Sequence, residues 1–146
     1  MDIALTLRDH RLEGYWLLTL GDAQQANGEP AEALASYQRS AALHRRLGNR
    51  SREAMAWNST ADAYRRLGRH EEAAQFHRRA AAVHHELGDT WDEAMALDGL
   101  AEALAAEEPQ AALGHWADAL RLLAGYDDPR AVAARERMES RRAETC

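Results

Sequence analysis

The sequence predicts an all-α protein made of stacked pairs of helices, and three observations support this. Alanine makes up about a fifth of the 146 residues, Val and Ile are scarce and Pro occurs three times, a composition that favours helix over strand. Leu-Gly at 47–48 and Glu-Ala-Met-Ala at 53–56 return 40 residues later, at 87–88 and 93–96. Such a period is typical of stacked helical units and not of a fold with one central active site.

Glycines divide the chain into helices of similar length. Gly28, Gly48, Gly68 and Gly88 fall every twenty residues, each after apolar residues at helical spacing, as a glycine directly after a helix does. Together with the positions of the prolines, this spacing predicts helices over about 10–27, 30–47, 50–67, 70–87, 90–106, 109–124 and 129–143. The loops are short, so successive helices should be antiparallel.

The expected helix starts carry suitable residues. The prolines stand where the first turn of a helix tolerates a missing N–H, at Pro30, Pro109 and Pro129. Residues whose side chains cap helices precede other starts, at Asp9, Asn49, Asp89 and Asp128. The first three of these recur at the 40-residue interval, so the first helix is expected to begin directly after Asp9.

Two apolar patterns alternate along the chain. The first helix of each pair carries a set at i, i+3, i+4 and i+7: Leu17, Leu20, Gly21 and Gln24, then Trp57, Thr60, Ala61 and Tyr64, then Leu97, Leu100, Ala101 and Leu104. The second helix answers with Ala33 and Tyr37, Ala73 and His77, and Ala112 and Trp116. Small residues in the third place of each set allow a close approach of the partner helix. We expect Trp57 and Trp116 to fill core positions.

These patterns resemble the tetratricopeptide repeat, with its W-x2-L-G-x2-Y and A-x3-F signature, over about residues 10–124. The resemblance implies an α-α superhelix (TPR solenoid) of three helix pairs with a C-terminal capping helix. The period of 40 exceeds the usual ~34 residues and the usual closing proline is missing. The longer unit is similar to the repeats of kinesin light chain and of the tails of bacterial multidomain regulators.

The pattern divides the chain into five parts. Residues 1–9 are expected to be the end of an incomplete preceding repeat, because Ile3 and Leu7 lie 40 residues before Leu43 and Leu47. Three repeats follow at 10–48, 49–88 and 89–126. Residues 127–146 form a capping helix and tail, polar on nearly all sides as a helix that shields the end of a stack should be.

Composition narrows the classes of partner. Acidic residues (24) outnumber basic ones (18, all Arg) for a net charge of −6, which argues against direct binding of nucleic acid and allows a basic partner. The single cysteine, Cys146, excludes a disulfide framework and favours the cytoplasm. No apolar run approaches the ~18 residues that cross a membrane.

The resemblance implies that the first helices line a concave face on which peptides bind. The residues expected on that face are Tyr15, Leu18, Asp22, Gln25, Met55, Asn58, Asp62, Arg65, Met95, Asp98 and Glu102. Asp22, Asp62 and Glu102 are spaced 40 residues apart and form what we call the acidic column, with Asp98 one turn from its last member. We expect this column to select a ligand with Arg or Lys, while Asn58 bonds its backbone and Met55 and Met95 contact its apolar side chains. The alternative is a solvated polar face with no ligand.

Metal binding and catalysis are not expected. His77, His84 and His85 share a helix but lack the i, i+4 spacing that places two imidazoles on one ion, and we expect His77 to pack between helices. No phosphate-binding loop or nucleophile with a recognisable context occurs, and no cofactor is indicated. The sequence therefore predicts a non-enzymatic scaffold for protein–protein interaction. The alternative is an oligomerisation module of a bacterial transcriptional or signalling regulator, associating through Ile3 and Leu7.

Overall fold

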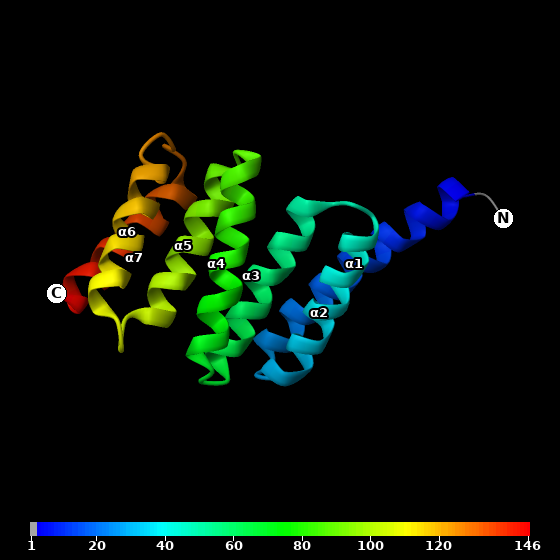
Figure 1. Ribbon diagram of the computed structural model, residues 1–146, viewed down its shortest axis with the longest axis horizontal. Coiled ribbons are helices and arrows are strands. Elements are labelled where there is room, and N and C mark those ends of the chain that lie inside the picture. The colour runs from blue at the N-terminus through cyan, green and yellow to red at the C-terminus, as the bar shows by residue number, and fades with distance from the viewer. Residues whose placement is uncertain (1–2) are drawn as a thin grey trace.

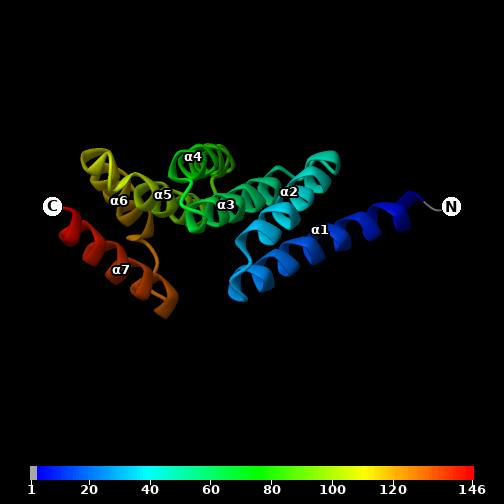
Figure 2. The same cartoon turned by 90° about the horizontal axis from the view of Figure 1, so that it is seen from below.

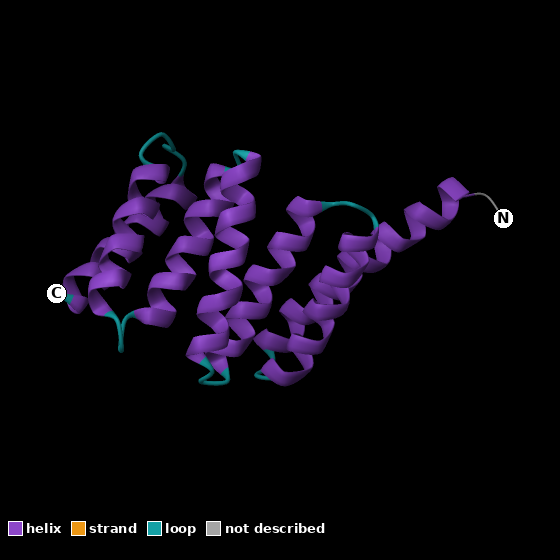
Figure 3. Ribbon diagram, in the orientation of Figure 1, coloured by secondary structure: helices purple, strands orange, loops and turns teal. Residues whose placement is uncertain are grey.

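The computed structural model describes the backbone of residues 3–146 and the side chains of residues 9–146. The described chain forms seven helices and no strand (Figure 3). They are α1 (Ile3–Ala26), α2 (Pro30–Arg46), α3 (Arg50–Arg66), α4 (His70–Leu87), α5 (Thr90–Leu104), α6 (Pro109–Leu123) and α7 (Pro129–Thr145). The all-α prediction is confirmed, and α2 to α7 begin and end within two residues of the expected limits.

The helices pack as three pairs in sequence order, with α7 against α6 at the C-terminal end (Figure 1). Within each pair the second helix packs on the first, and it also packs on the first helix of the next pair. Figure 2 shows α1 and α7 at opposite ends of the molecule, both tilted to the same side of the row formed by α3 to α6. None of the described helices is long and apolar enough to cross a lipid bilayer.

The four regularly spaced glycines close helices as expected. Each has a positive φ of 70–77°, a conformation that costs glycine little and other residues more. A Cβ added at any of the four would meet no atom within 4 Å, so the backbone and not crowding favours glycine there. The turn after α4 shows the role most clearly, because Asp89 N–H returns to His84 O over 2.9 Å across Gly88.

The N-terminal boundary differs from the prediction. The first helix was expected to start after Asp9, but α1 begins at Ile3 and runs through Asp9 without a break. Asp9 is therefore not a helix cap, and residues 3–9 continue the first helix of the first pair. The side chains of Ile3 and Leu7 lie outside the described residues. Asn49 and Asp128 are caps as predicted, accepting from Arg52 N–H and Ala131 N–H respectively.

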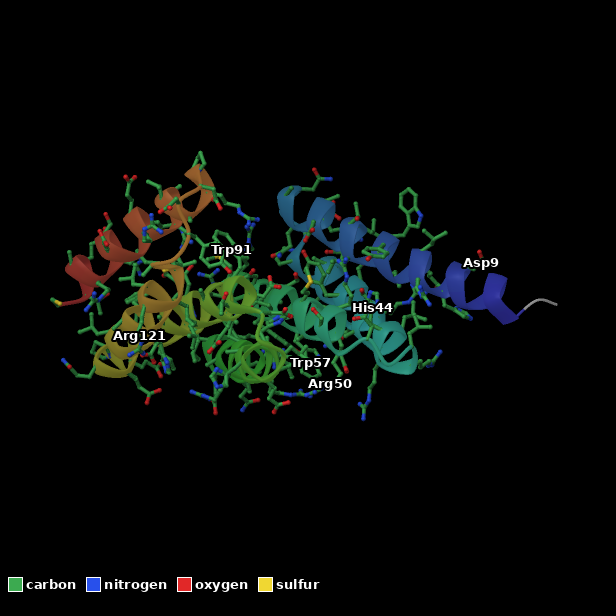
Figure 4. All side chains as sticks on the ribbon, turned by 90° about the horizontal axis from the view of Figure 1, so that it is seen from above. Asp9, His44, Arg50, Trp57, Trp91 and Arg121 are labelled. Atoms are coloured by element: carbon green, nitrogen blue, oxygen red, sulfur yellow. The ribbon has the colours of Figure 1, made fainter. Side chains whose placement is uncertain are left out.

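Buried rings at one repeat position fill the space between the helices. Tyr37, His77 and Trp116 are each 0 % exposed. Trp57 is only half-buried, and the guanidinium of Arg79 lies 4.3 Å from its ring centroid, so the prediction that Trp57 matches Trp116 as a core residue was wrong. Figure 4 shows Trp57 toward α4 and Trp91 on the opposite side, where α1 and α7 lie.

Candidate functional site

In the first pair, Asp22 of the predicted face bonds the buried ring of Tyr37. The phenol O–H donates to Asp22 Oδ1 over 2.5 Å, and Gln25 Nε2 donates to the phenol oxygen over 3.2 Å. Burial, reinforced by the bond to Asp22, raises the pKa of Tyr37 above its usual value, so the phenol stays a neutral donor. Asp22 itself remains exposed.

In the second pair, His77 stands between Asn58 and Asp62. Its Nδ1 lies 2.6 Å from Asn58 Oδ1, and its Nε2 lies 3.6 Å from Asp62 Oδ1. Burial, with a smaller contribution from Arg65, lowers the pKa of His77 to about 3. The neutral imidazole carries one N–H, so it donates either to Asn58 or toward Asp62, and not to both.

Asp62 keeps part of its surface open. Its side chain is 36 % exposed, and Arg65 Nη2 on the next turn of α3 donates to Asp62 Oδ1 over 3.0 Å. Burial raises the pKa of the Asp62 carboxyl, and the charge of Arg65 opposes this shift. The local partner of Asp62 is thus another member of the predicted face.

In the third pair, the predicted carboxylates hold the capping helix. Trp116 Nε1–H donates to Asp98 Oδ1 over 2.9 Å, and Arg137 Nη1 of α7 donates to Asp98 Oδ2 over 2.6 Å. Arg141 of α7 forms a two-bond pair with Glu102, through Nε at 2.8 Å and Nη2 at 2.9 Å. These bonds to Glu102, and then one to Glu144, raise the pKa of Arg141. The side chains of Asp98 and Glu102 are only 10 % and 18 % exposed.

The three pairs share one arrangement that the sequence reasoning missed. In each pair the polar atom of the buried second-helix ring reaches an oxygen of the predicted face: Tyr37 to Asp22, His77 to Asn58, and Trp116 to Asp98. Buried polar atoms require partners, so a polar ring at the same position of all three repeats was the available signal. The predicted face therefore has a structural role in the stack.

The other predicted residues are dispersed in their contacts. Tyr15 is exposed, with the Arg52 guanidinium 4.5 Å from its ring centroid. Leu18 packs against the core cluster of the first pair, and Met95 packs against the large C-terminal cluster. Met55 is half-buried. Of the predicted set, only Tyr15 lines any of the five cavities found in the described part of the chain.

A second surface stands out on α1. Leu12, Trp16 and Leu20, which we call the α1 stripe, are 47 %, 72 % and 48 % exposed. The positions that correspond to Trp16 and Leu20 in the next pairs are buried against the preceding helix, at Ala56 and Thr60 and at Ala96 and Leu100. The stripe is thus the uncovered face of the first layer.

The structure also brings together a group that spacing along one helix did not reveal. Ligand atoms of His84, Asp89 and Asp92 all lie within 4.8 Å of one another at the turn between α4 and α5. The search for i, i+4 histidine pairs passed over it, because two of its members follow the turn.

The sequence matches the tetratricopeptide repeat family over residues 12–84, and the chain belongs to this family. The N-terminal domain of stress-induced protein-1 (STI-1) from C. elegans is similar in structure, with a TM-score of 0.66 and 20% identity over 89% of this chain and 97% of that one. BtubC (BKLC) from P. vanneervenii is also similar, with a TM-score of 0.71 and 15% identity over 90% of this chain and 61% of that one. A search of curated proteins found no match. The likeness to the two solved structures shows the helical-repeat fold, and tetratricopeptide repeat domains are in general scaffolds for protein–protein interaction.

Proposed function

We propose that this chain is a non-enzymatic scaffold that binds an arginine-bearing polypeptide segment across α1 and α3, through Asp22 and Asp62. The observation that carries the proposal is the contact of α7 with α5. There, two arginines of a helical segment bond two carboxylates of the predicted face, Arg137 to Asp98 and Arg141 to Glu102. The third pair thus provides an example, inside the chain, of the chemistry proposed for the first two.

The spacing of the contacts defines the ligand. Arg137 and Arg141 are four residues apart on α7, as are Asp98 and Glu102 on α5, so successive turns of the two helices match. In the second pair the corresponding positions are Asn58 and Asp62, a neutral acceptor and a carboxylate. A helical segment with an arginine opposite Asp62 and a polar group one turn earlier fits this surface.

Charge alone provides little affinity. An exposed ion pair contributes ~0.2–1 kcal/mol, and Arg65 already contacts Asp62. Most of the binding energy would come from apolar contacts with Tyr15, Leu18 and Met55, while Asp22 and Asp62 select the arginine. The net charge of −6 favours a basic partner in the same way, and we place the interaction in the cytoplasm, without nucleic acid or a cofactor.

Fluorescence anisotropy tests the proposal with short labelled helical peptides that carry two arginines four residues apart. Each is paired with a peptide in which both arginines are replaced by glutamine. We expect the arginine peptides to bind and Asp62→Arg to weaken binding at least tenfold, because it places a like charge opposite the ligand. Glu139→Arg makes the same charge change at an exposed position of α7 outside the predicted set and should bind as the wild type does. Equal affinity of both variants would contradict the proposal.

A second candidate function is self-association through the α1 stripe, as in an oligomerisation module of a regulator. It is favoured by the 72 % exposure of Trp16 at a position that the next two pairs bury completely. Sedimentation of the full chain at several concentrations should then show a dimer that Trp16→Glu dissociates, whereas Val132→Glu, at an exposed apolar residue of α7, leaves it intact. A monomer at every concentration excludes this function.

A further inference from the structure

We propose that His84, Asp89 and Asp92 form a binding site for one divalent transition-metal ion of the zinc type, at the turn between the second and third pairs. The site is independent of the peptide-binding surface. One nitrogen and two carboxylate oxygens already lie within 4.8 Å of one another. Three protein ligands with room for water is the arrangement of an open zinc site.

His84 is the ligand that the fold sets in place. Its side chain is 1 % exposed, and its Nδ1 has no hydrogen-bond partner among the described residues. A buried polar atom without a partner costs free energy, and an unprotonated imidazole nitrogen is a common metal ligand. The ring is held from behind by the close packing of α4 on α5, so Nδ1 faces the turn.

The distance from His84 to Asp89 suits a shared ion better than a direct bond. Nδ1 of His84 lies 3.6 Å from Oδ2 of Asp89, which is too long for a hydrogen bond. Two ligand atoms bound tetrahedrally to zinc at about 2.0–2.1 Å stand about 3.4 Å apart. A small inward movement of the two carboxylates therefore completes the geometry, and the 37 % exposure of the Asp89 side chain allows that movement and the entry of the ion.

Asp89 is not used as a helix cap, although it holds that position before α5. Its side chain accepts no capping hydrogen bond, whereas Asn49 and Asp128 both do. Instead its Oδ2 accepts from Ser51 Oγ of α3 over 3.2 Å. A hydroxyl that orients a ligating carboxylate is the usual outer contact of a metal site.

The donor set selects the class of ion. A neutral imidazole with two carboxylates carries two negative charges, which one divalent ion neutralises. Calcium and magnesium prefer sites made only of oxygen, whereas imidazole suits zinc, nickel and cobalt.

The first turn of the same kind, between α2 and α3, is an internal control. There the buried His44, whose Nδ1 is likewise unpaired among the described residues, faces Asn49 and Arg52 at the positions of Asp89 and Asp92. An amide and a guanidinium cannot hold a cation with the imidazole. The buried histidine is thus common to both turns, and the two carboxylates distinguish the proposed site.

An ion at this turn would join the end of α4 to the start of α5. It would fix the angle between the second and third pairs, which lie on either side of the turn. Binding to the folded chain alone also raises its stability in proportion to the ion concentration.

Isothermal titration of the full chain tests the site, after treatment with a chelator, with zinc chloride as the probe. We expect one zinc per chain and a rise in melting temperature. Cobalt(II) should give the absorption bands of a site with nitrogen and oxygen ligands. Asp89→Asn and Asp92→Arg copy the residues of the first turn, and each should weaken zinc binding at least tenfold while circular dichroism shows unchanged helix content.

His85→Gln is the matched control, because His85 is exposed on the next position of α4 and contacts Glu93 at 3.1 Å. Zinc binding that persists in this variant and falls in the two aspartate variants supports the site. Absence of stoichiometric binding overturns the proposal, and so does binding that the aspartate variants leave unchanged. A loss in His85→Gln alone assigns the zinc to the His85–Glu93 pair and also overturns it.

Discussion

The indole N–H of Trp116 donates to Oδ1 of Asp98 over 2.9 Å, from the second helix of the third pair to the first. Both side chains are almost completely buried, and Asp98 takes a second bond from Arg137. The same carboxylate thus satisfies a core ring and attaches the capping helix, so its removal should affect both.

Asp98→Ala is expected to lower the free energy of unfolding by about 2–4 kcal/mol. It leaves the buried indole N–H without a partner and releases Arg137. Urea unfolding followed by circular dichroism measures the change. Trp116→Phe in the Asp98→Ala background should then have a smaller added effect than in the wild type, because the shared bond is already lost. Additive effects would contradict the bond.

Gly99→Ala is expected to destabilise the protein by ~1–3 kcal/mol, although alanine is the better helix former. A Cβ at Gly99 would lie 2.2 Å from the ring of His77, which is packed on both sides. Gly114→Ala in α6 is the control, because its Cβ meets no atom within 4 Å. The control should be stabilised by about 0.5–1 kcal/mol. Melting temperatures of the two variants should therefore move in opposite directions.

Stability should fall as the pH is lowered from 7 to 5, and His77 should cause much of the fall. Burial lowers its pKa from 6.5 to about 3 in the folded chain, so the unfolded chain binds the extra proton over this window. The contribution is fully present above pH 6.5 and amounts to about 2 kcal/mol lost by pH 5. In His77→Gln the pH dependence should be correspondingly smaller. An equal slope in both proteins would show that other groups carry it.

Arg141→Gln should loosen α7 without unfolding the stack. The substitution removes a two-bond pair with Glu102 at a side chain that is 34 % exposed, so the expected loss is modest, about 1 kcal/mol after allowance for solvent screening. Hydrogen exchange should be faster for amides of α7 and unchanged for those of α3 and α4. Protection lost evenly over all helices would contradict the local role of this pair.

The repeat was readable in the sequence, and the N-terminal boundary was not. Glycines at fixed intervals marked the helix ends because they adopt a positive φ, which few other residues do. Asp9 matched Asn49 and Asp89 in position, but no glycine or proline separates it from residue 3, and nothing interrupts α1 there. A capping residue alone does not end the helix that precedes it.

The face was predicted better than its contacts. Positions 40 residues apart must share a face, so the acidic column followed from the repeat. Its hydrogen bonds depend on the register between two helices, and Trp57 shows how little that register is encoded locally: Trp57 holds a core position of the pattern, yet it lies half-buried under Arg79. The metal group required two elements brought together by a turn, which spacing on one helix does not describe.

The different rings of the three pairs also bear on how the chain assembles. Tyr37 donates through an oxygen, His77 through a single imidazole N–H, and Trp116 can only donate. If a second helix folded against the first helix of another pair, Trp116 would face Leu18 or Asn58 instead of Asp98, and its N–H would lose the carboxylate. Near-identical hairpins are prone to such exchange during folding, and these unlike polar bonds penalise every arrangement except the native order.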